Sequence, residues 1–203
     1  MAEIFVSIML LLSYTVRSNN GVYRGTIVYG RDAHLAVESF TLYQNDELVY
    51  TREKPDVSTF FLGNTGKVFA LNDKCLYLYS QSGEALLLKE LNYPNRFGFS
   101  PDNLLFFASD KDGVFAYSEN GALVYTFKPG RLFASTEQGK MVAIISLDTL
   151  FLYEDGIQKF QWQLRTPYAR TVFFSKDEGT IVVEEPSENE IFNFYTGKKG
   201  RHE

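Results

Sequence analysis

The sequence is poor in the residues that carry most metal and redox chemistry. It has one cysteine and two histidines among 203 residues. A single cysteine excludes an internal disulfide framework and a multi-cysteine metal site, and two histidines leave little material for zinc binding or histidine-based catalysis. No phosphate-binding glycine loop and no G-x-S-x-G nucleophile motif occurs in the chain. The sequence therefore predicts a protein that needs no cofactor.

Basic residues are also in the minority. Lys and Arg number 20 against 25 Asp and Glu, which gives a formal net charge of −5. A protein that binds nucleic acid or an anionic membrane surface usually carries a basic excess. Residues 4–16, IFVSIMLLLSYTV, carry no charge, but this run is shorter than the about 20 residues that a membrane-spanning helix needs. We expect neither nucleic-acid binding nor a membrane span.

The first 18 residues read differently from the rest of the chain and allow two interpretations. They have the length of a signal-peptide core, and Val16 and Ser18 stand three and one residues before a plausible cleavage point. However, Glu3 lies where a signal peptide carries Lys or Arg. The alternative is a buried β-strand over residues 3–12, EIFVSIMLLL. The protein is secreted or periplasmic under the first interpretation and cytoplasmic under the second.

Aromatic residues are abundant, and they mark a repeat. The chain has 18 Phe and 13 Tyr but only 6 Pro, a composition that favours strands. An apolar run, a Tyr, a few polar residues with Gly or Asp, and a second apolar run recur as LYLYSQSGEALLL (76–88), VFAYSENGALVYTF (114–127) and LFLYEDGIQKFQW (150–162). The tyrosines that anchor this phrase are spaced 36, 38 and 36 residues apart: Tyr43, Tyr79, Tyr117 and Tyr153.

A second marker follows the same period of about 37 residues. Turn residues spaced 36, 37, 36 and 40 apart separate pairs of apolar runs: Gly30, Gly66, Asn103, Gly139 and Gly179. Each of these segments is typical of strand, tight turn and strand, because Gly and Asn adopt the positive φ that such turns require. Each repeat then holds four short strands. This pattern predicts an all-β fold, a β-propeller-like array of about five four-stranded repeats, in one domain over residues 19–203.

One repeat resembles a known group of propellers. The segment FSPDNLLFFASDKDGVFAYSENG (99–121) is similar to the repeats of WD-repeat-like and TolB-type β-propellers, in which F-S-P-D-G opens the first hairpin. The Trp-Asp dipeptide and the Gly-His pair of true WD repeats are absent. The resemblance implies the fold and no chemistry.

The fifth repeat stops at Lys199 with only the beginning of a fourth strand. Propellers often close when a terminal strand completes the last blade and removes the open edge. Residues 3–12 would close a five-bladed ring if they are a strand. If residues 1–18 are cleaved, the array instead keeps an open edge that can pair with another chain. A third alternative is that the chain forms part of a longer propeller, and no oligomeric state is predicted.

Two sets of connections carry the candidate ligand-binding residues. Every connection between the second and third strands of a repeat contains acid, with Glu38 and Glu190 beside the candidates Asp73, Asp110, Asp112, Asp148 and Glu188. Each of the four connections between repeats contains Pro together with at least one Lys or Arg, and two of them add the candidates Tyr93 and Tyr168. In a propeller both sets lie on one face, which suits a protein or glycan partner. Ordinary turn chemistry also explains the acids.

Catalysis finds little support. Some five-bladed propellers hydrolyse sugars with carboxylates on their innermost strands, but the segments FFL (60–62), FGF (97–99), LFA (132–134) and VFF (172–174) carry no acid. We expect Cys75 to be a buried, inert thiol and His34 a surface residue. The predicted function is a non-catalytic binding or scaffolding module. The alternatives are a sugar-acting propeller enzyme and a structural subunit that pairs its open edge with another chain.

Overall fold

The computed structural model describes residues 13–30, 36–175 and 179–200. The chain divides into two compact units. Unit 1 comprises residues 1–72 and 77–86, and unit 2 comprises residues 73–76 and 87–203.

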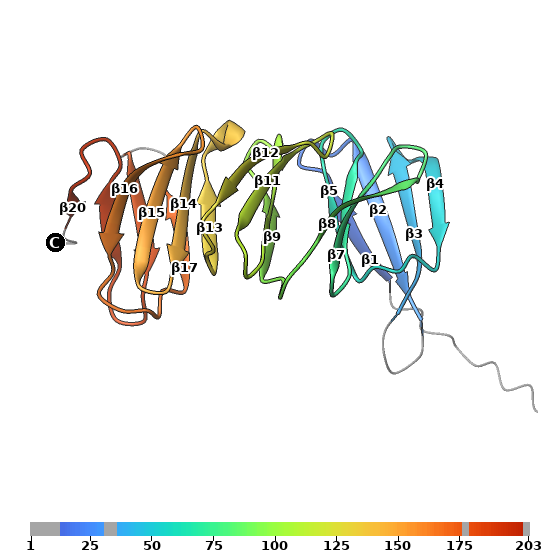
Figure 1. Cartoon of the computed structure of the whole chain (residues 1–203). Helices are drawn as coiled ribbons and strands as arrows, with labels where there is room; N and C mark the ends of the chain where they lie inside the picture. The colour runs from blue at the N-terminus through green and yellow to red at the C-terminus, as the bar shows by residue number, and fades with distance from the viewer. Residues whose placement is uncertain (1–12, 31–35, 176–178, 201–203) are drawn as a thin grey trace, which may run out of the picture. The chain divides into compact units, whose positions relative to one another are not determined.

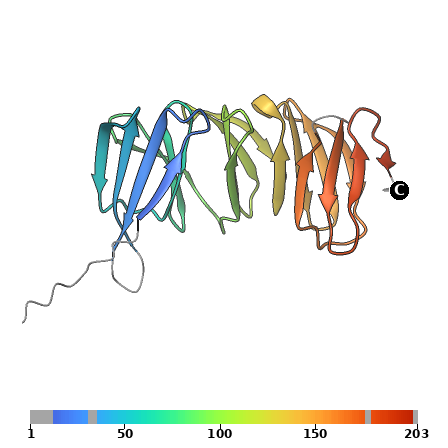
Figure 2. The same cartoon turned by 180° about the vertical axis from the view of Figure 1, so that it is seen from behind.

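The strands form five four-stranded sheets, each made of four strands that are consecutive in the chain (Figures 1 and 2). We call them blades 1 to 5. Blades 1 and 2 are β1 (Ser13–Arg17), β2 (Tyr23–Tyr29), β3 (Val37–Gln44) and β4 (Glu47–Glu53), then β5 (Thr59–Leu62), β6 (Val68–Leu71), β7 (Cys75–Tyr79) and β8 (Ala85–Glu90). Blades 3 and 4 are β9 (Arg96–Phe99), β10 (Leu105–Ser109), β11 (Val114–Ser118) and β12 (Leu123–Phe127), then β13 (Leu132–Ser135), the short 3-10 helix η1 (Glu137–Gly139), β14 (Met141–Ser146), β15 (Thr149–Glu154) and β16 (Ile157–Gln163). Blade 5 is β17 (Thr171–Phe174), β18 (Thr180–Glu184), β19 (Glu190–Asn193) and β20 (Lys199–Gly200). The predicted all-β, propeller-like array of five four-stranded repeats is confirmed.

The turn between the first and second strands of each blade contains a residue with positive φ, as the second sequence marker predicts. In blade 1, however, this residue is Gly21 (φ 72°) and not Gly30. The Gly21 N–H donates to the Ser18 carbonyl at 3.0 Å, just as the Asn103 N–H donates to the Ser100 carbonyl at 2.9 Å in blade 3. The sequence pattern therefore assigned the wrong turn residue to the first repeat, because the first strand of that repeat lies inside the segment that looked like a leader. Tyr43 lies in the third strand of its blade, as predicted.

That first strand is β1. It pairs with β2 along its whole length, from Ser13 opposite Val28 to Arg17 opposite Arg24, and Val16 packs against the core of unit 1. The closing strand predicted over residues 3–12 lies outside the described residues. Cleavage after Ser18 would remove β1 and leave the edge of β2 unpaired.

Within each unit, neighbouring blades pack face to face through apolar side chains. In unit 1, the rings of Phe40 in blade 1 and Phe60 in blade 2 stack at 4.5 Å between centroids. In unit 2, Phe107 of blade 3 lies 5.5 Å from Phe133 of blade 4, and blades 4 and 5 share a second buried cluster. Three of the repeated tyrosines, Tyr79, Tyr117 and Tyr153, are buried packing residues.

The face of blade 1 that points away from blade 2 and the face of blade 5 that points away from blade 4 differ in polarity. On blade 1, the residues that pack on blade 2 alternate with a row of threonines directly opposite one another across all four strands: Thr15, Thr26, Thr41 and Thr51. On blade 5, the middle row that points away from blade 4 consists of Phe173, Val182, Ile191 and Gly200. Phe173 is 41% exposed. Blade 1 thus presents hydroxyl groups, whereas blade 5 presents an apolar surface.

Candidate binding face

Connections of both predicted kinds come together in unit 2. They line an open hollow of about 400 Å³, formed by residues 93–95, 110–111, 129–131 and 146–147. A neighbouring hollow of about 600 Å³ is lined by residues 73–75 and 90–94. Tyr93 and Pro94 belong to both linings and stand between the two hollows. We call this surface of unit 2 the loop face.

Two exposed apolar side chains flank the first hollow. Tyr93 is 78% exposed and Leu147 is 76% exposed, the highest fractions among the large apolar residues described. Both have left-handed backbones, with φ of 56° for Tyr93 and 54° for Leu147. Such a conformation is rare for bulky residues and costs about 1–3 kcal/mol. Since neither side chain is used for internal packing, strain and exposure coincide at the two positions that border the hollow.

Leu147 is held in this conformation by a tight turn. It follows Ser146, which pairs with Thr149, so only Leu147 and Asp148 connect β14 to β15. Glycine is preferred where the first residue of a two-residue hairpin turn has positive φ. A leucine here is unfavourable for the turn and available for contact with a partner.

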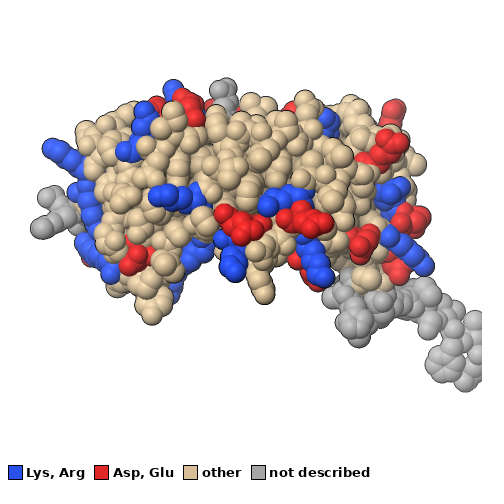
Figure 3. Space-filling view, viewed as in Figure 1, with Lys and Arg blue, Asp and Glu red and all other residues tan. Residues whose placement is uncertain are grey.

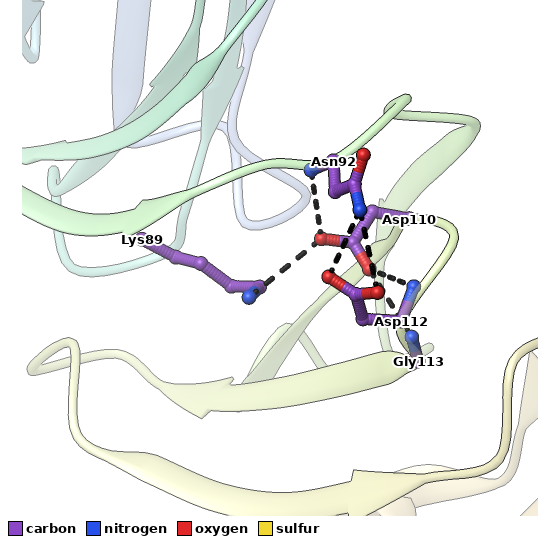
Figure 4. Close-up of polar contacts among 5 residues, drawn as sticks. All are labelled: Lys89, Asn92, Asp110, Asp112 and Gly113. Atoms are coloured by element: carbon purple, nitrogen blue, oxygen red, sulfur yellow. Dashed lines mark hydrogen bonds and ion pairs between the residues drawn. The ribbon is translucent and has the colours of Figure 1, made fainter.

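Asp110 fixes the segment that carries Tyr93. Its carboxylate is fully buried and accepts backbone N–H groups from Asn92 at 3.2 Å, Asp112 at 2.8 Å and Gly113 at 3.1 Å. The Lys89 ammonium lies 3.6 Å from the same carboxylate (Figure 4). These four partners satisfy the charge inside the protein and bind the connection after β8 to the turn after β10.

The charge of Asp110 also acts on its surroundings. Burial, followed by the electrostatic effect of Asp110, raises the pKa of the Tyr117 hydroxyl to about 12. Tyr117 thus stays neutral in the physiological range.

Side chains also link successive connections between blades. The Asn95 amide donates to the Arg131 carbonyl at 3.5 Å. The Arg131 guanidinium then donates to the carbonyls of Ala169 and Pro167, both at 2.6 Å. The three connections after β8, β12 and β16 are therefore joined by hydrogen bonds, and the loop face is a supported surface rather than a set of independent loops.

The acidic side chains of blade 5 also form ion pairs and hydrogen bonds within the protein. Glu188 forms an ion pair with Arg165, and the buried Glu190 accepts the Arg165 backbone N–H at 2.6 Å and pairs with the Lys199 ammonium. Burial would raise the pKa of Glu190, but these two partners and a hydrogen bond from Glu185 together lower it. Burial and the hydrogen bond to Glu190 raise the pKa of Glu185. The two carboxyl groups thus share interactions beneath the surface.

The structure places the predicted ligand residues in different environments. Tyr93, Asp73 and Asp110 lie around the hollows, and Asp112 is exposed with the Asn92 amide 3.4 Å from its carboxylate oxygens. Asp148 is half-buried and accepts the Thr149 hydroxyl at 3.3 Å. Tyr168 is 70% exposed on the connection that Arg131 supports.

Other residues correct or extend the sequence prediction. Glu38 lies within β3 and not in the connection before it. Cys75 is half-buried, not buried, and lines the second hollow, while His34 lies outside the described residues. Sequence reasoning missed Leu147 and Arg131. A leucine between two apolar strands, at the position of a tight turn, was a visible signal for the first, and nothing in the sequence indicated the partners of the second.

The described residues were compared with the requirements of a metal site and of a membrane-spanning helix. On the side of the molecule drawn in Figure 3, acidic side chains lie beside basic ones. Among the residues that the structure describes, no group of three or more His, Cys, Asp or Glu is arranged to hold a metal ion. Within the same described ranges, no helix has the length and apolar character needed to cross a membrane.

The fold and the loop face define a propeller-like module with a supported surface of connections. No protein-family model matches the sequence, and no curated protein matches it. Solved structures do match, in 535 chains, so the likeness marks a widely used fold. The structure of apo AztD from Citrobacter koseri matches 93% of this chain with a TM-score of 0.62 and 13% sequence identity. The match takes in 58% of the AztD chain, so this chain spans less than two thirds of its length.

Proposed function

We propose that the chain is a non-catalytic binding or scaffolding module that recognises a protein or a glycan through the loop face. The proposal rests on one observation, the exposure and backbone conformation of Tyr93 and Leu147 beside the same hollow. Both are exposed, both have strained backbones, and both border one hollow. Asp110 holds the connection that carries Tyr93, and the two-residue turn between β14 and β15 holds Leu147. Strained residues that the fold does not use for packing concentrate at functional sites, and exposed aromatic and aliphatic anchors are typical of binding surfaces.

A sugar-acting enzyme is the weaker alternative. The first strands of the five blades read SYTVR, TFFL, RFGF, LFAS and TVFF and contain no Asp or Glu. The buried carboxylates of Asp110 and Glu190 are engaged by internal partners. A two-carboxylate mechanism needs two acids facing a substrate. The other alternative, a structural subunit, would use the edge of β19, where the described residues of β20 pair with Ile191 and Phe192 alone.

The finer sequence predictions belong to this proposal. They are a relationship to WD-repeat-like or TolB-type propellers, a single domain over residues 19–203, and export to the periplasm or the medium if residues 1–18 are a signal peptide, with a cytoplasmic location otherwise. The proposed ligand-contacting residues are Tyr93, Leu147, Tyr168, Asp73, Asp112, Asp148 and Glu188, while Asp110 supports the surface from within.

The test is to screen the full chain against a glycan array and a displayed library of random peptides, and to repeat the screen with Tyr93→Ala. We expect at least one ligand, with affinity reduced about tenfold or more by Tyr93→Ala, as for truncation of an interface anchor. Tyr195→Ala is the matched control, because Tyr195 is 75% exposed and lies outside both hollows. Equal losses in both variants, or no ligand in either screen, would contradict the proposal.

A further inference from the structure

We infer that the ligand of the loop face is a protein segment that inserts an aromatic or large aliphatic side chain between Tyr93 and Leu147. This inference rests on the proposed function and narrows it to one class of partner. It depends on which groups around the hollow remain available to a ligand.

The polar side chains that line the hollow are largely engaged by the protein itself. The Asp110 carboxylate accepts three backbone N–H groups and faces Lys89. The Arg131 guanidinium donates to two backbone carbonyls, and the Asn95 amide donates to a third. A ligand that binds through hydroxyl groups would have to compete with these contacts. Asp110 is the buried member of the set, so breaking its contacts would leave a buried carboxylate without its partners.

The surface that remains is mostly apolar. Tyr93 and Leu147 flank the hollow, and Pro94, Pro129 and Gly130 contribute to its lining. Proline has no backbone N–H to offer a ligand, and glycine has no side chain. Burial of apolar surface is therefore the main source of binding energy here, which suits an apolar side chain better than a sugar ring with its many hydroxyl groups.

The surroundings have the layout of a protein–protein contact. Around the apolar centre stand exposed residues of both signs, Lys111 and Asp112, with Asp73 and Lys74 at the second hollow. An apolar centre with a polar rim is the usual anatomy of such interfaces. The open hollow accepts one anchor side chain from a partner that covers the face, and the strained backbones hold Tyr93 and Leu147 in position before binding.

Leu147→Gly gives a sharp test, because it separates binding from folding. Glycine adopts the positive φ without strain, so we expect the unfolding midpoint of this variant to be equal to or higher than that of the unaltered chain. The same change removes one wall of the hollow. We expect it to weaken binding of a peptide selected from the random library by about tenfold or more, measured by fluorescence anisotropy with the full chain. Tyr195→Ala should leave the affinity unchanged.

The selected peptides provide the second readout. We expect them to share a Trp, Phe, Tyr, Leu or Ile, and we expect alanine at that position to abolish measurable binding. Binding of array glycans together with failure of every peptide would overturn this inference while leaving the proposed binding function intact. Peptides that lack a common apolar residue, or that bind Leu147→Gly as tightly as the unaltered chain, would also overturn it. Absence of any ligand on both the array and the library would overturn the proposed function as well.

Discussion

The side chain of Asp110 lies completely inside the protein although it belongs to a turn. Its three N–H partners and Lys89 convert a turn acid into the support of the segment that carries Tyr93. Asp112, two residues further along, has only long contacts with the Asn92 amide at 3.4 Å and is exposed. Two acids that are equivalent in the sequence pattern therefore differ in their contribution to stability.

We predict that Asp110→Ala lowers the free energy of unfolding by about 2–4 kcal/mol, because it leaves Lys89 and three backbone N–H groups without their partner. Asp112→Ala should change it by less than about 0.5 kcal/mol, as expected for an exposed polar residue. Urea denaturation of the two variants and the unaltered chain provides the measurement. Similar losses in both variants would show that burial does not distinguish these acids.

The sequence could predict that acids and tyrosines lie on these connections, but not what each side chain does. Lys89 in β8 and Asn92 in the connection after it are 21 and 18 residues from Asp110. The burial of Asp110 therefore depends on contacts with a segment that precedes its own blade. Arg131 and its carbonyl partners are separated by 36 and 38 residues. Turn chemistry is local and readable from the sequence, whereas these partnerships follow from how one blade packs on the next.

Among the elements, β1 shows that the length of a repeat can be predicted correctly while the first turn of its first copy is assigned to the wrong residue. The spacing of the tyrosines and turn residues predicted four strands per repeat, and blades 2 to 5 follow that phase. In blade 1 the turn between the first and second strands follows Ser18 and contains Gly21, whereas the sequence pattern assigned this turn to Gly30. The apolar, uncharged character of residues 4–16 fits both a leader and a buried strand, so composition alone could not choose between them.

The contribution of β1 can be measured by comparing two shortened chains, one beginning at Ser13 and one beginning at Asn19. The second lacks β1, which pairs with β2 at five positions, and it also lacks Val16 on the core of unit 1. We predict that it is less stable than the first by more than about 2 kcal/mol, or that it loses cooperative unfolding. Equal thermal unfolding of the two chains would mean that β1 is dispensable, as expected for the end of a cleaved leader.

At the scale of the whole molecule, the threonine row gives one face of blade 1 a polar character. Stacked repeats bury apolar faces against their neighbours, and the terminal repeat of an array usually needs a polar outer face to stay in solution. Blade 1 has such a face, in which the hydroxyl groups of Thr41 and Thr51 lie 3.2 Å apart. Blade 5 instead presents Phe173, Val182 and Ile191.

Replacing Thr26 and Thr41 with Val should make the face of blade 1 complementary to that of blade 5. We predict concentration-dependent, head-to-tail association, since contacts between two different faces need not close. Sedimentation velocity would detect species larger than those of the unaltered chain. The control is Thr26→Ser with Thr41→Ser, which keeps the hydroxyl groups, and adding Phe173→Asp to the valine variant should reverse the association. A valine variant that sediments like the unaltered chain would contradict this explanation of the threonines.

The row of threonines also gives the molecule a direction for protein engineering. A further four-stranded unit can be fused after β20 onto an apolar surface that already exists. The same unit fused before β1 would first require replacement of up to four hydroxyl-bearing side chains: Thr15, Thr26, Thr41 and Thr51. A unit designed to pack on blade 5 therefore needs an apolar face, whereas a unit designed to pack on blade 1 needs polar partners for the threonine hydroxyl groups.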